Sequence, residues 1–317
     1  MKTALLFPGL DSLFLGAKLR RWLDTPEVAK ALKQASIHLS TLTGDPEDLE
    51  KLLREESRPH VTDFDRTLVA LMALQVGIAR TLQETETWDL LLGCSHGDIA
   101  RSVMAGSLPF EGAVEVVWFF SVLRKSCPDG CTANVRTTDG SALNETQLAW
   151  LEEKGFPVSQ WSSENATIAG ERTAVQESVI PGRAMGIKIK PVLPYPVHSP
   201  VMKASADVLR AESGRWPLRA PNKPVFSSVW CRFISTSDEI REEALMGSIS
   251  AIRWMPSISE LVAKHGVTRF LNVGPSNTLT GWIMESDLMK HVELVDAWDH
   301  LNPAMASTGD GSNDESA

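Results

Sequence analysis

One short stretch constrains the fold of this chain more than any other. The apolar run from Trp88 to Leu92 is typical of a short buried strand, and the residues after Gly97 are typical of a helix. Between them stands Gly93-Cys94-Ser95-His96-Gly97, a Gly-x-Ser-x-Gly pattern typical of a sharp strand-to-helix turn that exposes a serine hydroxyl. Side chains at the two glycine positions would crowd so tight a turn. The stretch predicts an α/β fold with Ser95 as a candidate nucleophile.

Charge and cysteine content narrow the class of protein. The 317 residues carry a formal net charge of −9, which argues against nucleic acid or an anionic membrane as a partner. We recognise neither a signal peptide nor an apolar run of membrane-spanning length, and we expect a cytoplasmic protein. The four cysteines form no disulfide or zinc framework, so we expect no metal site. A redox or metal pair of Cys127 and Cys131 is the alternative.

The alternation of helix-like and strand-like segments predicts two subdomains. Residues 1–130 and 198–302 are expected to form a large α/β-hydrolase-like domain with a parallel sheet. Residues 131–197 follow a strand-helix-strand-strand-helix-strand order, which predicts an inserted, small ferredoxin-like α+β subdomain. Its predicted strands are 132–138, 157–161, 166–169 and 184–189, and its helices are 144–154 and 172–179. The polar, acidic residues 303–317 are expected to be a disordered tail.

A serine hydroxyl needs a base before it can act as a nucleophile. His96 follows Ser95 directly, and its side chain should project away from the hydroxyl, although its backbone N–H is well placed as an oxyanion donor. His198 is the better candidate base, because it lies in a loop of four prolines that can hold an imidazole in place. The alternative is a structural or surface histidine.

Several stretches together resemble the malonyl-CoA:acyl carrier protein transacylase family, which includes the acyltransferase domains of polyketide synthases. The resemblance covers nearly all of residues 3–300, and its motifs occur in the order expected for the family. They are Leu6-Phe7-Pro8-Gly9, Gly93-Cys94-Ser95-His96-Gly97-Asp98, His198-Ser199-Pro200-Val201-Met202, Pro224-Val225-Phe226-Ser227-Ser228 and Gly274-Pro275-Ser276-Asn277-Thr278-Leu279-Thr280-Gly281.

The resemblance implies a role for each of these positions. Ser95 would accept the acyl group, and His198 would be its general base. The backbone N–H groups of Leu10 and His96 would form the oxyanion hole. A backbone carbonyl, near Ile252 or before Gly274, would orient the imidazole. No resident cofactor is implied, because the phosphopantetheine arm arrives on the acyl carrier protein or on CoA.

Departures from the family pattern bear on the acyl group. The family carries a carboxylate-binding arginine 25 residues after the serine, and this position here is Phe120. An apolar ring cannot pair with the carboxylate of a malonyl group. Val197 replaces a phenylalanine that narrows the pocket of malonyl-specific relatives. We therefore expect a larger, uncharged acyl group. The alternatives are that Arg124, one turn further on, takes over the carboxylate, or that both changes only repack the core.

Other departures leave further candidates open. Arg66 or Leu68 stands where the family has a pocket glutamine, and Ser228 where it has an asparagine. Arg66 or Arg101 could assist at the pocket mouth, or be a solvated surface arginine. A docking site for the acidic carrier protein should be basic. We assign this role to Arg183, Lys188, Lys190 and Lys203, with a merely solvated face as the alternative.

The sequence thus predicts an acyltransferase with a Ser-His dyad and ping-pong chemistry. It would move an acyl group from a carrier-protein or CoA thioester, through Ser95, to an acyl carrier protein thiol in polyketide-type, antibiotic-forming biosynthesis. The alternatives are an editing hydrolase of acyl carrier protein thioesters with the same dyad, and a carrier-binding module whose catalysis has decayed. An ordinary α/β-hydrolase is disfavoured, because no convincing acidic third member precedes His198.

Overall fold

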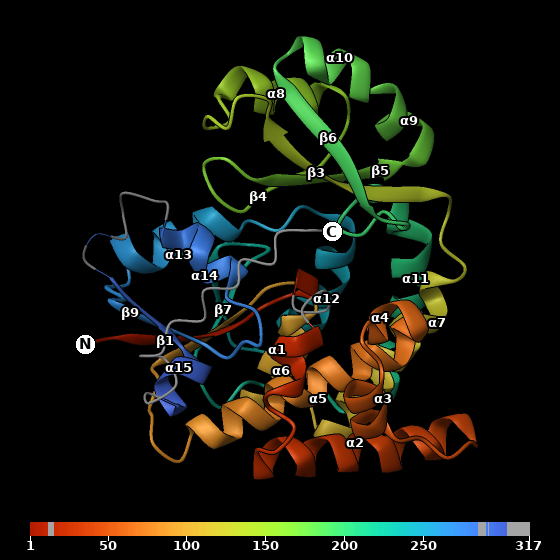
Figure 1. The fold of residues 1–317 in the computed structure, drawn as a ribbon, viewed down its shortest axis with the longest axis vertical. Coiled ribbons are helices and arrows are strands. Elements are labelled where there is room, and N and C mark those ends of the chain that lie inside the picture. The colour runs from red at the N-terminus through yellow and green to blue at the C-terminus, as the bar shows by residue number, and fades with distance from the viewer. Residues whose placement is uncertain (12–15, 285–289, 291, 303–317) are drawn as a thin grey trace.

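The computed structural model describes residues 1–11, 16–284, 290 and 292–302, and the predicted tail lies outside this part of the chain. A large α/β subdomain forms the body of the molecule, and a smaller one sits at one end of it, uppermost in Figure 1. Because the small subdomain is continuous in sequence, the chain leaves the large subdomain once and returns once. The predicted α/β fold with an inserted antiparallel subdomain is confirmed.

The large subdomain is built on a central sheet whose described strands follow the order β10-β9-β1-β2-β7-β8. Their bounds are β1 (Thr3–Phe7), β2 (Leu90–Gly93), β7 (Val225–Ser227), β8 (Arg232–Ile234), β9 (Arg269–Asn272) and β10 (Glu293–Asp296). All neighbouring pairs run parallel except the edge pair of β7 and β8, which is antiparallel. Both central strands, β1 and β2, are buried along their whole length, as near-continuous apolar runs demand.

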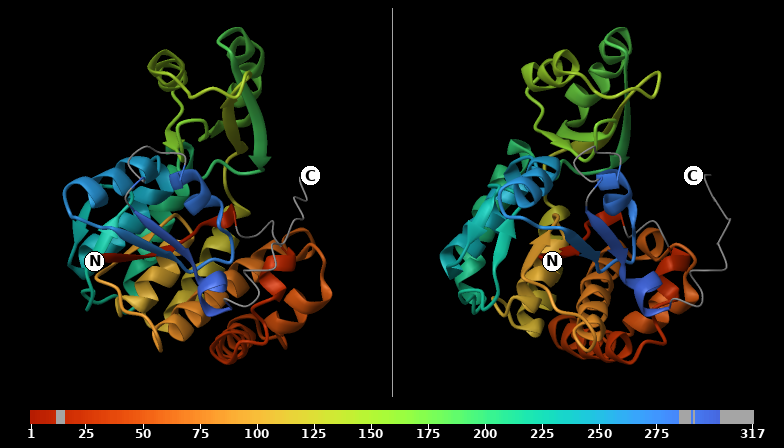
Figure 2. Two further views of the ribbon diagram at one scale, coloured as in Figure 1. Left: turned by 60° about the vertical axis from the view of Figure 1, so that its left-hand side comes forward. Right: turned by 90° about the vertical axis from the view of Figure 1, so that its left-hand side faces the viewer.

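Helices cover the sheet and extend well beyond it on one side (Figure 2). The described helices before the small subdomain are α1 (Gly16–Arg20), α2 (Pro26–Thr43), α3 (Leu49–Glu55), α4 (Pro59–Thr62), α5 (Phe64–Leu82), α6 (Gly97–Met104) and α7 (Phe110–Arg124). After it come η2 (Pro200–Met202), α11 (Lys203–Glu212), η3 (Ser213–Arg215), α12 (Ser237–Ile249), α13 (Trp254–Ala263), α14 (Thr278–Met284) and α15 (Ala297–Leu301).

Helix α5 is the buried helix of this assembly, as its small and apolar residues predict. It crosses α2 at Gly77, where an added Cβ would lie 2.5 Å from the Cα of Val28. Only a glycine allows the two backbones to approach so closely. The N-terminus of α5 is capped by Asp63, whose side chain accepts a hydrogen bond from the backbone of Arg66.

The small subdomain has the ferredoxin-like order of elements. These are β3 (Gly130–Thr137), α8 (Glu145–Glu153), β4 (Val158–Gln160), β5 (Ala166–Glu171), α9 (Arg172–Glu177), α10 (Val179–Ala184) and β6 (Ile187–Leu193). The strand order β4-β5-β3-β6, with every neighbouring pair antiparallel, is that of a ferredoxin-like sheet. The predicted strand 184–189 begins too early, because the second helical segment runs on as α10 and the left-handed Gly186 then turns the chain.

Side chains from the small subdomain contact the large one. Trp161 stacks on Trp282 with 6.3 Å between ring centroids, and it belongs to the core cluster under β1 and β2. The hydroxyl of Ser159 accepts a hydrogen bond of 2.8 Å from the backbone of Ile252. These contacts join the small subdomain to the large one. None of the described helices combines the length and apolarity needed to cross a membrane.

Candidate active site

The turn between β2 and α6 has the close packing that its glycines predict. An added Cβ at Gly93 would lie 2.4 Å from a carboxylate oxygen of Asp98, and one at Gly97 would lie 2.2 Å from the carbonyl oxygen of Phe7. Ser95 itself has φ +56°, in the left-handed region that non-glycine residues rarely adopt. This backbone strain is typical of a nucleophile elbow, and it holds the hydroxyl at the top of the sheet.

Ser95 and His198 lie together although 103 residues separate them. The Oγ of Ser95 is 2.7 Å from the Nε2 of His198, within hydrogen-bond reach. On the other side of the ring, Nδ1 of His198 donates to the main-chain carbonyl of Gly247 at 2.5 Å. That donation leaves Nε2 free to accept the serine proton. Burial lowers the pKa of His198 to about 4, so the ring is neutral near pH 7.

The loop that carries His198 is fastened at several points. The hydroxyl of Thr132 in β3 donates to the carbonyl of Tyr195, and the hydroxyl of Ser199 donates to the carbonyl of Pro196. His198 has φ +62°, a second non-glycine residue in the left-handed region. Such a conformation costs about 1–3 kcal/mol and persists only where the surroundings enforce it. The loop therefore presents the imidazole in one fixed orientation.

A cavity of about 170 Å³ opens beside the dyad. Its wall is mainly apolar, which suits an acyl chain. Among the predicted site residues, those in its lining are Leu10, Ser95, His96, Phe120, Val197 and His198, and Arg124 lies there too. Sequence analysis missed α12, which supplies Glu243, Ala244, Gly247 and Ser248 to the same wall.

The structure places both predicted oxyanion donors at this cavity. An added Cβ at Gly9 would lie 3.1 Å from the carbonyl oxygen of Cys94, so the loop before Leu10 packs directly on the serine turn. Buried Gln75 secures the loop, because its side-chain amide donates to the carbonyl of Pro8 at 2.7 Å. The backbone N–H groups of Leu10 and of His96, the residue after the nucleophile, stay the predicted oxyanion hole.

The side chain of His96 is half-buried and hydrogen-bonds to the backbone of α5. Burial lowers the pKa of His96 to about 4, although a hydrogen bond to the backbone of Leu68 opposes that shift. The ring is therefore neutral near pH 7 and is engaged by α5. Leu68, one of the two candidates for the position of the family's pocket glutamine, is itself buried, and its backbone contacts His96.

Arg124 is the basic residue in the lining of this cavity. Its guanidinium donates to Asp65 at 2.6 Å, and Lys125 contacts the other oxygen of the same carboxylate at 2.7 Å. Although burial raises it, hydrogen bonds from Lys125 and Arg124 hold the pKa of Asp65 below its usual value. The Nε of Arg124 is buried and has no hydrogen-bond partner within the described part of the chain.

Arg101, which the sequence offered as a helper at the pocket mouth, is buried in the interior. Its guanidinium contacts both oxygens of Glu243 at 3.1 and 2.5 Å, and it lies 2.8 Å from a carboxylate oxygen of Asp98. Two carboxylates thus share one cation. Burial raises the pKa of Asp98, and the charge of Arg101 opposes this shift. This Arg101 triad (Asp98, Arg101 and Glu243) joins α6, the helix that follows Ser95, to α12. The Gly247 carbonyl of α12 accepts the hydrogen bond from His198.

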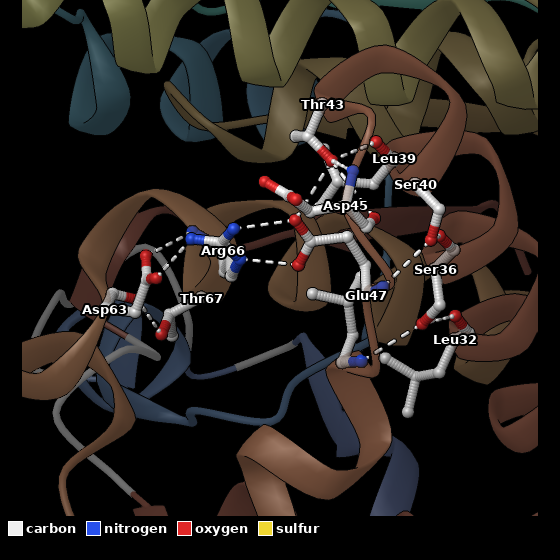
Figure 3. Close-up of polar contacts among 11 residues, drawn as sticks. Leu32, Ser36, Leu39, Ser40, Thr43, Asp45, Glu47, Asp63, Arg66 and Thr67 are labelled. Carbon is white, nitrogen blue, oxygen red and sulfur yellow. Dashed lines mark hydrogen bonds and ion pairs between the residues drawn. The ribbon is translucent and has the colours of Figure 1, made fainter.

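Arg66 lies in the first turn of α5. Figure 3 shows its guanidinium between two carboxylates, and Nε and one terminal nitrogen contact Glu47 at 2.5 and 2.6 Å, while the other contacts Asp63 at 2.7 Å. It is not in the lining of the catalytic cavity. Ser228 is also outside that lining; it is fully buried after β7, and its carbonyl accepts a hydrogen bond from Arg253.

The four predicted docking residues are exposed but spread out. Lys188 and Lys190 alternate with buried isoleucines on β6 and share one face of that strand. Arg183 lies in α10, at the far end of the small subdomain, whereas Lys203 begins α11 on the large one (Figure 1). Lys203 is paired with Asp207 at 2.9 Å. The structure brings Lys188 and Lys190 together on β6 and places Lys203 on the other subdomain.

Within the described ranges no cluster of three metal-ligating side chains occurs. Cys127 and Cys131 are free thiols. The sulfur of Cys127 contacts the sulfur of Met202 at 3.5 Å, and Cys131 is buried in β3. The two residues therefore have separate surroundings, and neither shows the metal or redox arrangement considered from the sequence.

Comparison with known proteins agrees with this geometry. Residues 23–279 match the model of a protein family described as the acyl transferase domain. The malonyl CoA-acyl carrier protein transacylase of Escherichia coli (strain K12) is 27% identical over 286 residues, which are 88% of this chain and 90% of that protein. The enzyme of the same name from Bacillus subtilis (strain 168) is 26% identical and covers 89% of each chain.

Solved structures show the same architecture. The malonyl CoA-acyl carrier protein transacylase of Coxiella burnetii superimposes with a TM-score of 0.82 at 25% identity, over 94% of each chain. A malonyl-transacylase solved in complex with a type II polyketide-synthase acyl-carrier protein gives a TM-score of 0.79 at 25% identity, over 93% of this chain and 97% of that one.

Proposed function

Because the chain belongs to the acyl transferase domain family, we propose that it moves an acyl group between thioesters through Ser95 and delivers it to the thiol of an acyl carrier protein. The observation that carries this proposal is the distance of 2.7 Å between the Oγ of Ser95 and the Nε2 of His198. Similarity to transacylases that act on acyl carrier proteins, one of them in complex with a polyketide-synthase carrier, supports the acceptor.

The first half-reaction would acylate the serine. Oγ of Ser95 attacks the thioester carbonyl as its proton passes to Nε2 of His198. The tetrahedral oxyanion forms beside the N–H groups of Leu10 and His96, whose removal in comparable sites slows the reaction by about two to three orders of magnitude. The carbon–sulfur bond then breaks, and His198 returns the proton to the departing thiolate. The Gly247 carbonyl supports the transient imidazolium.

The second half-reaction would reverse these steps with another thiol. The carrier's thiol gives its proton to His198 and attacks the acyl-serine ester. The ester carbon–oxygen bond breaks, and Oγ of Ser95 regains the proton. The phosphopantetheine arm belongs to the carrier or to CoA, so the protein itself supplies only the dyad, the oxyanion donors and the acyl cavity.

A neutral acyl group larger than malonyl fits this cavity best. Two carboxylates, Asp98 and Glu243, lie in its wall, as does Phe120, the position at which the family resemblance implies a carboxylate-binding arginine. A carboxylate held beside them without a cation would be costly to bury. Arg124 is already engaged by Asp65. Its unpartnered Nε makes it the single competing anchor for a dicarboxylic acyl group in the described lining.

The test of the cargo compares acyl donors by intact mass spectrometry. Acetyl, hexanoyl, octanoyl and malonyl thioesters of CoA and of a carrier protein would be offered to the protein, and the rate of adduct formation measured. We expect Ser95 to be loaded faster by a neutral group than by malonyl, and Ser95→Ala to carry no adduct. Malonyl loading that exceeds every neutral group, and that Arg124→Gln abolishes, would overturn the cargo assignment.

The same mixture tests the acceptor. With a holo carrier protein present, we expect the acyl group to leave Ser95 as acyl carrier protein. Release mainly as free acid, with or without a carrier, would show that water is the second acceptor and the protein an editing hydrolase. If no donor forms an adduct with Ser95, the protein is a carrier-binding module without catalytic activity.

A further inference from the structure

A second cavity lies behind the catalytic one. It has a volume of about 80 Å³, against about 170 Å³ for the cavity at Ser95. The two share one wall, which consists of Asp98, Ile99, Phe120, Glu243 and Ala244. The catalytic cavity therefore has a neighbour that the reaction mechanism does not use.

Apolar side chains dominate the far side of this second cavity. They are Leu108, Val116, Leu209, Trp216, Leu218, Ile240 and Leu245. Two guanidinium groups also line this cavity, and both are paired within the protein, Arg101 with Glu243 and Arg241 with Asp238. The hydroxyls in its lining are satisfied within the protein, because Ser102 donates to the carbonyl of Asp98 at 2.7 Å and Ser213 to that of Arg210 at 2.8 Å. A space with this lining suits an alkyl chain and offers little to a polar group.

The side chains of the shared wall differ in how freely they can move. Asp98 and Glu243 are held by their ion pairs with Arg101, so neither can leave the wall without exposing a buried charge. Ala244 is small. The ring of Phe120 is the largest apolar side chain of the wall, is only partly buried, and can turn about two side-chain bonds. Phe120 is therefore the residue that decides whether the two spaces communicate.

We propose that the acyl chain passes Phe120 and places its distal end in the second cavity, so that Phe120 sets the chain length that Ser95 accepts. The proposal rests on the function proposed above and assigns its substrate to unbranched, medium-length acyl thioesters. An apolar cavity of about 150 Å³ holds one benzene molecule. By that measure the catalytic cavity holds roughly six carbons and the second cavity roughly three more.

The test measures how fast Ser95 is loaded by a series of acyl thioesters from two to twelve carbons. Val116→Phe fills the second cavity from α7. We expect it to lower the ratio of nonanoyl to acetyl loading about tenfold, since a hydrophobic site discriminates by roughly that factor per methylene. Phe120→Ala joins the two spaces and should raise the same ratio. Phe120→Leu serves the same purpose if the alanine variant fails to fold.

Val122→Phe is the matched control. It makes the same substitution on the same helix, but Val122 is 47% exposed and lines neither cavity, so the chain-length profile should match the wild type. An unchanged profile in Val116→Phe and in both Phe120 variants would overturn the proposal while acetyl loading of Ser95 still upholds the acyltransferase. If no thioester of any length loads wild-type Ser95, the proposed function itself fails.

Discussion

The main-chain carbonyl of Gly247 accepts the Nδ1 proton of His198 at 2.5 Å, at the point where serine hydrolases commonly place a carboxylate. A carbonyl fixes the tautomer and the ring orientation as a carboxylate would. It brings no full negative charge, however, so it stabilises a protonated ring less. His198, the base of the dyad, therefore stays neutral and able to accept a proton over a wide range of pH.

This relationship predicts the pH dependence of acylation. Burial lowers the pKa of His198 to about 4, and only the neutral ring can take the proton of Ser95. The single-turnover rate of Ser95 acylation should rise with pH through an apparent pKa of about 4 and stay level from about pH 5.5 to 8. Stopped or quenched reactions read by intact mass would measure it. An acid limb centred near the ordinary histidine value of about 6.5 would contradict this environment for His198.

The serine turn predicts a steric effect at Gly97. A Cβ there would lie 2.2 Å from the carbonyl oxygen of Phe7, so Gly97→Ala must push α6 away from β1. We expect a loss of about 3 kcal/mol in unfolding free energy, measured in urea, and at least a hundredfold slower acylation of Ser95.

Gly281→Ala is the control for that substitution. Gly281 lies inside α14, and an added Cβ would have no heavy atom within 4 Å, so stability should stay level or rise by up to about 1 kcal/mol. If Gly97→Ala behaves like Gly281→Ala in both measurements, the close approach of the turn to β1 is not required.

We expect Arg66 to contribute to the stability of the fold and not to the rate of Ser95 acylation. The Glu47 side chain is only 3% exposed, so Arg66→Ala leaves its carboxylate without its main partner. Unfolding free energy should fall by roughly 1–3 kcal/mol, while the rate of Ser95 loading stays within twofold of wild type. Arg54→Ala removes an exposed ion pair with Asp24 and should leave stability close to wild type. If the Arg66→Ala variant acylates Ser95 more slowly under conditions where it is fully folded, Arg66 contributes to substrate binding after all.

Local signals explain why the serine turn and the small subdomain could be predicted from sequence, whereas the pairing of Ser95 with His198 rests on the resemblance to the transacylase family. The spacing of Gly93 and Gly97 reports a turn that only glycine permits, and the prolines around His198 report a rigid loop. The order of its strand-like and helix-like segments predicts the topology of the small subdomain, and Asn144 caps α8 in a capping box with Gln147. Each of these signals lies within a few residues of the feature that it predicts.

Helix α12 lacked a periodic apolar signal, and with it the partner of His198 was missed. Its apolar residues Ile240, Ala244, Leu245, Met246 and Ile249 do not fall on one face of the helix, so periodicity does not reveal a buried face. A readable sign was present, because Thr236 and Glu239 form a capping box at its start. The sequence left two places for the orienting carbonyl, one near Ile252 and one before Gly274, and Gly247 lies five residues from the first. Pairs such as Arg101 and Glu243, which are 142 residues apart, depend on tertiary packing alone.

The Arg101 triad predicts the largest loss of stability. Arg101 is 1% exposed, and Arg101→Met leaves the carboxylates of Asp98 and Glu243 facing each other in the interior. Unfolding free energy in urea should fall by about 3–5 kcal/mol near pH 7. Burial already raises the folded-state pKa of Asp98 above its usual value, and loss of the cation raises it further, so the deficit should grow as pH rises and shrink as pH falls toward 5. Adding Glu243→Leu to Arg101→Met removes one of the two stranded charges and should restore at least about 1 kcal/mol. A single variant as stable as the wild type, or a deficit that grows toward acid pH, would show that the triad does not hold α6 against α12.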